Sequence, residues 1–325
     1  MLRNIAIVGG GDSSEYVISV KSAAQIIELI NKDKYRPFAV TVKGTEWFAK
    51  MPDGSDIAVD LRDFSISPNG KKLRLEYAFI IIHGTPGENG KLQAYLDMQK
   101  IPYSTSSVLS SALTFNKYAC KIYLKNFGIT TAEAVMINKK RSVSNEAIID
   151  KVGLPCFVKP NNGGSSFGTS RVNKADEMED AIREAFKEDN EVIVESFVKG
   201  TEISCGLVKT SEEEIIFPIT EIVTSNEFFD YEAKYTDGMA EEITPARLSD
   251  DITKRCRQLA SEIYDNLDCR GIVRIDFIIR GNQIYFLELN SIPGMSRESI
   301  VPKQIRAMGL EVEDIIDKVI EDTFR

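Results

Sequence analysis

The sequence lacks the features that mark several common classes of protein. Its five cysteines are odd in number and include no Cys-x-x-Cys pair, which argues against a disulfide framework or a zinc site and favours a reducing compartment. No run of about 18 apolar residues occurs, so we expect no membrane span. The formal net charge is −9, whereas a protein that binds nucleic-acid phosphates needs a cationic face. Membrane and nucleic acid are therefore not expected as partners.

Two nucleotide-binding fingerprints are missing as well. Gly9 and Gly11 are followed by Ser14 where a dinucleotide-binding turn has its third glycine, and no Walker A motif is present. An oxidoreductase with a Rossmann fingerprint therefore loses its main support. The first apolar stretch, Ile5 to Val8, is too short for the core of a signal peptide and is typical of a first strand. We expect a cytoplasmic protein.

What the sequence does contain is enough apolar material for two or three packed modules. Its 325 residues are 43% hydrophobic and 27% charged, as in an ordinary globular protein. Short apolar runs alternate with helical patterns, which is typical of an α/β (α+β) fold. The expected strands are 4–8, 36–42, 77–82, 157–159 and 191–195, the expected helices are 14–31, 91–99, 107–127, 175–187, 250–267 and 312–323, and a hairpin is expected at 271–290. Residues 224–245 are polar, aromatic and poorly periodic, which predicts a long mobile loop.

The segment GIVRIDFIIRGNQIYFLELN, residues 271–290, predicts a hairpin with one apolar and one polar face. The apolar face is expected to carry Val273, Ile275, Phe277, Ile279, Tyr285, Leu287 and Leu289. A two-residue turn at Gly281-Asn282 would set this face against the polar one, because side chains alternate along a strand. We therefore predict an odd-length turn or a bulge that places Arg274 opposite Glu288. Asp276, Glu288 and Asn290 would then share one surface.

Asp276, Glu288 and Asn290 offer two carboxylates and an amide oxygen. Such hard ligands suit Mg²⁺ beside nucleotide phosphates. An exposed ion pair on an ordinary hairpin is the plainer interpretation of the same residues. The turn at 291–295 favours the metal site, because Gly294 permits close approach of the backbone and its N–H can face a developing oxyanion, with the charge of Arg274 alongside.

Residues 154–168, LPCFVKPNNGGSSFG, predict a phosphate-binding segment. A short apolar strand carrying Lys159 leads into a loop rich in glycine and serine. Backbone N–H groups in such a loop can surround phosphate oxygens, and the lysine can reach them from the strand. A flexible turn without a ligand has the same composition and stays open as the alternative.

Several motifs follow one another in a fixed order. They are GGGDSSEYVIS (9–19), HGTPGENGKLQ (83–93), Asn116-Lys117, KPNNGGSSFG (159–168), DYEAKY (230–235), RID (274–276) and ELNSIPGMSRESIVP (288–302). In this order they resemble the ATP-grasp superfamily and, within it, the D-alanine–D-alanine ligase family over nearly the whole chain. The resemblance implies an ATP-grasp fold with an N-terminal Rossmann-like βα domain at 1–103, a central nucleotide-clamping subdomain at 104–198 and a C-terminal subdomain at 199–325.

The resemblance also implies an activity. In this family ATP phosphorylates the carboxylate of a first D-alanine, and the amine of a second D-alanine attacks the acyl phosphate, which yields D-alanyl-D-alanine for peptidoglycan precursors. Two Mg²⁺ or Mn²⁺ ions and lysine side chains offset the charge on the transferred phosphoryl group. A homodimer is expected, as in relatives.

Matched residue by residue, the resemblance assigns roles to individual side chains. The residues implied to bind ATP are Lys117, Lys159, Ser166, Glu195, Val198, Glu202 and Lys234. Those implied to bind or activate the two D-alanines are Glu15, His83, Arg274, Gly294, Ser299 and Ile300. Plainer interpretations remain for two of them: Glu15 suits a helix start through the helix dipole, and a lone histidine such as His83 is often structural.

The choice of second substrate is implied by Tyr235. In the family this tyrosine is linked through a serine, here Ser165, towards the N-terminal glutamate, and it accompanies D-alanine as the second substrate. Relatives that make D-alanyl-D-lactate carry other residues there. Two departures put single contacts in doubt: Ser196 stands where a lysine is common, and Phe229 where some members have tyrosine.

Three other functions stay open. Another ATP-grasp ligase could use a different acid or nucleophile, including D-lactate. A nucleotide-binding regulator without catalysis is disfavoured, because a pure binder would not need metal ligands and oxyanion groups together. The oxidoreductase is disfavoured by its defective glycine fingerprint.

Overall fold

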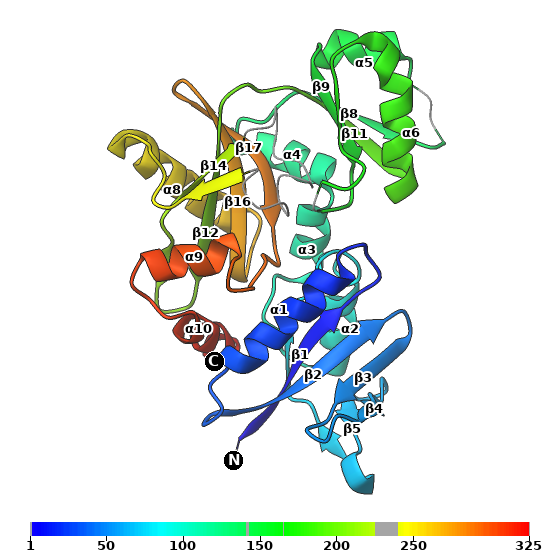
Figure 1. The fold of residues 1–325 in the computed structure, drawn as a ribbon, viewed down its shortest axis with the longest axis vertical. Coiled ribbons are helices and arrows are strands. Elements are labelled where there is room, and N and C mark those ends of the chain that lie inside the picture. Colours follow the sequence, from blue (N-terminus) through cyan, green and yellow to red (C-terminus); the bar gives the residue numbers. More distant parts are fainter. Residues whose placement is uncertain (1, 141–142, 165, 225–239, 325) are drawn as a thin grey trace.

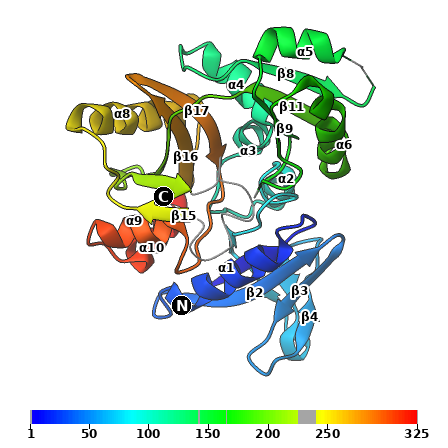
Figure 2. The same ribbon diagram turned by 45° about the horizontal axis from the view of Figure 1, so that its top comes forward.

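The computed structural model describes residues 2–140, 143–164, 166–224 and 240–324, which form three large β-sheets with flanking helices. The N-terminal sheet lies at one end of the molecule, and the second and third sheets lie side by side at the other (Figure 1). A view turned by 45° shows the three sheets, each with its helices, as separate groups arranged around the middle of the molecule (Figure 2). The expected α/β (α+β) class is confirmed.

β1 is the centre of the N-terminal sheet. The strand order is β4-β3-β2-β1-β7, and β1 pairs in parallel with β2 and β7. Residues 5–8 are fully buried, which explains why this strand shows an unbroken apolar run instead of alternation. The elements of this part are β1 (Arg3–Gly10), α1 (Tyr16–Leu29), β2 (Tyr35–Lys43), β3 (Glu46–Lys50), β4 (Asp56–Ala58), β5 (Ser65–Ile66), η1 (Pro68–Gly70), β6 (Leu73–Arg74), β7 (Tyr77–Ile80) and α2 (Lys91–Gln99).

The second sheet is antiparallel, with the order β10-β9-β11-β8 and helices α5 and α6 on one face. Val158 of β9 belongs to the core under these helices, so the alternation of the strand turns Phe157 and Lys159 to the other face. The elements are β8 (Ala134–Asn138), α5 (Asn145–Val152), β9 (Cys156–Pro160), β10 (Ser170–Val172), η2 (Ala175–Glu177), α6 (Met178–Glu188) and β11 (Glu191–Ser196).

The third sheet is also antiparallel, with the order β15-β14-β12-β16-β17 and β13 paired to β12. Its elements are β12 (Thr201–Lys209), β13 (Glu214–Ile216), β14 (Thr220–Thr224), β15 (Ala240–Ile243), α8 (Asp250–Asn266), β16 (Gly271–Arg280), β17 (Gln283–Asn290), α9 (Ile300–Ala307) and α10 (Val312–Thr323). The expectation of a loop over 224–245 is wrong at 224, the last residue of β14, and at 240–243, which form β15. Two glutamates there hide the strand from sequence patterns, but antiparallel pairing with β14 forms it. The rest of that expectation, 225–239, lies outside the described residues.

The single helix expected at 107–127 is also wrong, because the chain forms α3 (Val108–Phe115) and α4 (Lys117–Lys125). Asn116 adopts an extended conformation, and its side chain accepts a hydrogen bond of 2.9 Å from the N–H of Ala119, which caps α4. Lys117 therefore stands in the first turn of a new helix. Its own N–H donates to the carbonyl of Asn161 at 3.1 Å, which ties this helix start to the glycine-rich loop.

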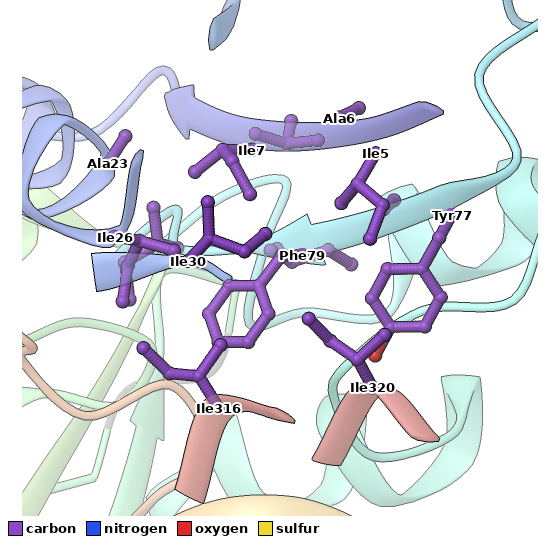
Figure 3. Close-up of a cluster of buried hydrophobic side chains, with 14 of the residues drawn as sticks. Ile5, Ala6, Ile7, Ala23, Ile26, Ile30, Tyr77, Phe79, Ile316 and Ile320 are labelled. Atoms are coloured by element: carbon purple, nitrogen blue, oxygen red, sulfur yellow. The ribbon is translucent and has the colours of Figure 1, made fainter. Parts of the chain in front are cut away.

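The two ends of the chain share one core. Ile316 and Ile320 of α10 pack against Phe79 and Tyr77 of β7, beneath the N-terminal sheet (Figure 3). Because the same core also contains Val208 and Ile272, it connects the third sheet with the first. The domain boundaries expected at 103/104 and 198/199 stay predictions; they fall between α2 and α3 and between β11 and β12.

Two expectations from composition can be compared with the described residues. The five cysteines are all buried and none forms a disulfide. Among the helices in the described ranges, none combines the length and the apolar run that crossing a membrane requires.

Candidate active site

One cavity of about 1000 Å³ lies where the three sheets meet. Its walls come from the start of α1, the loop after β7, the start of α4, strands β9, β11, β12, β16 and β17, and the turn before α9. The expected site residues that line it are Glu15, His83, Lys117, Lys159, Ser166, Glu195, Val198, Glu202, Arg274, Asp276, Glu288, Asn290, Gly294, Ser299 and Ile300. The other three, Ser165, Lys234 and Tyr235, lie outside the described residues.

The β16–β17 hairpin contains the expected bulge, but its register differs from the prediction. Arg274 pairs with Asn290 and Asp276 with Glu288, so the expected pairing of Arg274 with Glu288 is wrong. The turn is closed by Arg280 and Gln283, and the register shifts by one residue beyond Asp276.

The bulge decides which side chains of β17 enter the core. Ile284, Phe286 and Leu289 are buried, whereas Tyr285 and Leu287 are only partly buried. The expected apolar face was therefore wrong on the turn side of the bulge. The turn has two residues, and the extra residue in β17 reverses the alternation of side chains beyond it. Apolar side chains of β17 are therefore buried on both sides of the bulge.

The carboxylate of Asp276 is held by three side chains. Arg274 donates to it twice, from Nε at 3.0 Å and from Nη2 at 2.8 Å. Ser204 of β12 donates at 2.6 Å, and the Asn290 amide nitrogen at 3.1 Å. This last bond uses the amide nitrogen of Asn290. The amide oxygen, which is the atom that would bind a metal, takes no part in it. Asp276 is thus fixed in place directly opposite Glu288.

Lys117 connects this hairpin with the glycine-rich loop. Its Nζ donates to the carbonyl of Gly163 and lies 3.5 Å from Glu288 Oε2. The loop also reaches the start of α1, where a Cβ at Gly164 would lie only 2.6 Å from Glu15 Oε2. A side chain at 164 would therefore displace the Glu15 carboxylate from its present position.

Glu195 sits between two lysines. Its Oε2 lies 2.6 Å from Lys159 Nζ, and its Oε1 lies 2.8 Å from Lys121 Nζ. Burial alone would raise the pKa of Glu195, but the two positive charges outweigh it and lower the pKa to about 2. Sequence reasoning missed Lys121. The available signal was its spacing, four residues after Lys117, which places both lysines on one face of a helix.

The other end of the cavity contains Glu15, His83 and a turn of the third sheet. Glu15 is buried at the start of α1. His83 Nδ1 lies 3.0 Å from the carbonyl oxygen of Ile292, so this nitrogen carries the proton. Burial lowers the pKa of His83, which favours the neutral ring. A Cβ at Gly294 would lie 2.8 Å from Ser299 Oγ, so a side chain at 294 would displace this serine.

Glu88 was missed although it lies within a quoted motif. Its carboxylate is buried and accepts hydrogen bonds from the backbone N–H groups of Gly84, at 2.8 Å, and Ile292. Burial and the nearby charge of Glu15 raise the pKa of Glu88 to about 8. A lone acid in a glycine-rich loop gives no pattern that reveals such burial. Together with His83 it holds the backbone of Ile292, two residues after Asn290.

Comparison with known families covers almost the whole chain. The model described as D-ala D-ala ligase N-terminus matches residues 4–106, and the one described as D-ala D-ala ligase C-terminus matches residues 123–321. The D-alanine–D-alanine ligase of Phocaeicola vulgatus is 51% identical over 325 residues, covering 100% of both chains. That of Bacteroides fragilis (strain YCH46) is 49% identical over the same length.

Solved structures of similar proteins share the fold. D-alanyl-alanine synthetase A from Vibrio cholerae superposes with a TM-score of 0.88 at 26% identity, covering 100% of this chain and 99% of that one. The VanG D-Ala:D-Ser ligase from Enterococcus faecalis gives 0.87 at 29% identity, covering 99% and 100%. The ATP complex of D-alanine–D-alanine ligase from Bacillus anthracis gives 0.80 at 29% identity, covering 100% and 98%. With two family models and full-length relatives in agreement, the chain belongs to the D-alanine–D-alanine ligase family.

Proposed function

We propose that this protein joins two molecules of D-alanine into D-alanyl-D-alanine, at the expense of ATP, for peptidoglycan precursors. The observation that carries the proposal is the single cavity in which the hairpin's two carboxylates, buried lysines and Glu15 meet. Full-length relatives that are about half identical and named D-alanine–D-alanine ligase support the same activity.

The first step makes the carboxylate of one D-alanine reactive. A carboxylate oxygen attacks the γ-phosphorus of ATP, the bond to ADP breaks, and D-alanyl phosphate forms. Lys117 and Lys159 line the cavity and are proposed to contact the phosphates, as is Lys234, which lies outside the described residues. The residues from Glu195 to Val198 are proposed to bind the adenine, and Glu202 the ribose.

Asp276, Glu288 and Asn290 fit a divalent cation. They present two carboxylates and an amide oxygen on one side of a fixed hairpin. The described residues contain no group of three acidic, histidine or cysteine side chains that could hold a metal ion without help. We propose that phosphate oxygens of the nucleotide, together with water, complete the coordination. Mg²⁺ or Mn²⁺ bound there, two ions in our proposal, would offset negative charge on the phosphates.

The second step forms the peptide bond. The amine of the second D-alanine attacks the acyl carbon, and phosphate leaves. Arg274 and the N–H of Gly294 are proposed to stabilise the oxyanion, because both lie beside the hairpin end where the phosphates would bind. Glu15 is proposed to bind the first ammonium group with His83 next to it. Ser299 and Ile300 are proposed to contact the second D-alanine.

The second substrate is the finest part of the proposal. The same fold occurs in a D-Ala:D-Ser ligase, so the likeness of folds does not select D-alanine. We propose D-alanine because of Tyr235 and Ser165 in the sequence and because full-length relatives about half identical to the chain are named D-alanine–D-alanine ligase. The alternative is a ligase that accepts D-lactate or another nucleophile.

The test is product analysis with a panel of acceptors. The protein is incubated with ATP, Mg²⁺ and D-alanine, alone or together with D-serine, D-lactate or L-alanine, and ADP and products are quantified by mass spectrometry. We expect one D-alanyl-D-alanine for each ADP. Preferential formation of a mixed product would favour another ligase of this fold, and ATP binding without turnover would favour the regulator.

The homodimer and the cytoplasmic location belong to the same proposal. Both rest on family membership. Sedimentation equilibrium should give twice the chain mass of 36.3 kDa, and fractionation of cells should recover the protein with soluble enzymes.

A further inference from the structure

Lys121 is a buried lysine for which the proposed reaction has no role. It lies one helical turn after Lys117 on α4, and both side chains reach the cavity. Only 1% of Lys121 is exposed, although lysine is among the side chains that are almost never buried without a partner. Its partner is Glu195, whose Oε1 lies 2.8 Å from Lys121 Nζ.

Glu195 is shared between Lys121 and a second lysine. Lys159 approaches the other oxygen, Oε2, at 2.6 Å. Both lysines and the glutamate are buried, so each charge depends on the others in a medium of low polarity. Burial lowers the pKa of Lys121, whereas the charge of Glu195 opposes this shift. These three side chains include one acidic and two basic groups, and the carboxylates of Glu288 and Glu202 also act on Lys159.

The proposed function requires Lys159 to serve the nucleotide. A phosphate that contacts its ammonium group competes with Glu195 for the same positive charge and weakens that pairing. If Glu195 had no other partner, this movement would leave a buried carboxylate alone, which is strongly unfavourable. Lys121 removes this obstacle, because it contacts the other carboxylate oxygen, Oε1, and can keep that contact when Lys159 moves.

We propose that Lys121 is a positioning residue for nucleotide binding: it holds the buried Glu195 carboxylate so that Lys159 is available to the phosphates of ATP. This inference rests on the proposed nucleotide site but not on the identity of the acid or amine that is joined. Lys121 acts through Glu195 and Lys159 and needs no contact with the substrate.

Lys125 provides a matched control. It lies one turn further along α4 and pairs with Glu133 at 3.1 Å, but 37% of its side chain is exposed. Replacing it by methionine removes the same charge from the same helix. Lys121→Met keeps the length and the apolar stem of the buried side chain and removes only the charged end.

The experiment measures the binding of ATP, ADP and adenosine to the full-length protein by calorimetry. In Lys121→Met we expect the Kd of ATP and of ADP to rise about tenfold, because Lys159 is now retained by Glu195. Adenosine carries no phosphate and should bind within about twofold of the wild type. Lys125→Met should behave as wild type. Unchanged ATP binding in Lys121→Met, or an equal loss for adenosine, overturns the proposal.

A double-mutant cycle tests the route through Glu195. In a Glu195→Gln background there is no buried carboxylate to hold, so adding Lys121→Met should change the Kd of ATP by less than about twofold. An equal tenfold loss in both backgrounds overturns the proposal. If Lys121→Met alone does not fold, the double variant is compared with Glu195→Gln, and the same limits apply. If the wild-type protein binds ATP but forms no D-alanyl-D-alanine, the proposed function is contradicted. The role of Lys121 in ATP binding can still be tested in that case.

Discussion

Asp276 lies directly opposite Glu288 because an extra residue in β17 bulges beside the pair. Without the bulge the two-residue turn at 281–282 would continue its register and bring an apolar side chain opposite Asp276. The irregularity therefore sets both carboxylates on the cavity side while the core side stays apolar.

Replacing Glu288 should separate catalysis from folding. Glu288→Gln keeps the shape of the side chain and removes one of the proposed metal ligands, so we expect kcat to fall by about a hundredfold or more with a nearly unchanged melting temperature. Gln283→Ala, at the exposed end of the same strand, is the control and should retain activity. Near-normal turnover of Glu288→Gln would show that the metal assignment is wrong.

Asp276→Ala should lose stability as well as activity. Arg274 would remain partly buried without its carboxylate, and an uncompensated buried charge costs about 3–5 kcal/mol. Urea unfolding should therefore report a clear decrease in the free energy of unfolding relative to Glu288→Gln. Equal stabilities of the two variants would argue against the structural part of this account.

Metal binding should depend on the nucleotide. Two carboxylates and one amide supply fewer oxygens than an octahedral cation takes, so phosphate oxygens are expected to add ligands and strengthen binding. Titration with Mn²⁺, followed by electron paramagnetic resonance, should show at least about tenfold tighter binding with ADP or ATP present than without. Equally tight binding to the free protein would mean that the site is complete by itself.

Glu88 should make stability fall as the pH rises. Burial and Glu15 raise its pKa to about 8 from the ordinary value of 4.5, so the folded protein keeps a proton that the unfolded chain releases. The contribution of Glu88 to the free energy of unfolding is fully present below about pH 4.5. It decreases by about 1.4 kcal/mol per pH unit as the pH rises from there to about 8.

Glu88→Gln mimics the protonated acid and should remove this slope. The stability of the variant minus that of the wild type, measured by urea unfolding between pH 5 and pH 8, should rise with pH (about 1.4 kcal/mol per unit). Glu46→Gln, at an exposed glutamate, should give a constant difference. A flat difference for Glu88→Gln would show that Glu88 is ionised in the folded protein.

Tyr235→Phe should relax the choice of second substrate. Tyr235 lies outside the described residues, so this prediction rests on the family resemblance. Removing the hydroxyl should increase the yield of D-alanyl-D-lactate relative to D-alanyl-D-alanine when both acceptors compete. Phe229→Tyr is a useful comparison on the same segment. A product ratio that does not change in Tyr235→Phe would remove the role of this residue.

Regular elements were predictable where pattern and burial agree. The helices α2 and α10 begin and end at the predicted residues, and the apolar run from Ile5 to Val8 correctly predicted a first strand. β15 was not predictable because its glutamates lie on an edge strand that only its partner β14 specifies. The break at Asn116 was missed because both flanking segments have helical patterns.

The candidate site was predictable where residues follow one another in a motif. Single charged residues that are buried in the fold could not be predicted from the sequence. Lys121 and Glu88 look like surface residues in the sequence, and their burial follows from contacts with Glu195 and Ile292, which lie about 70 and 200 residues further along the chain. The hairpin register was predicted wrongly for a related reason. An odd-length turn and a bulge both keep the apolar side chains of the two strands on one face, and only packing in the folded protein decides between them.

We infer that the cavity converts a D-alanine carboxylate into an acyl phosphate and then into a peptide. The most direct measurement uses D-alanine labelled with ¹⁸O in its carboxylate, together with ATP and Mg²⁺. We predict that D-alanyl-D-alanine forms and that each released phosphate carries one ¹⁸O atom taken from the first D-alanine. Phosphate without label, or ADP release without dipeptide, would contradict the account.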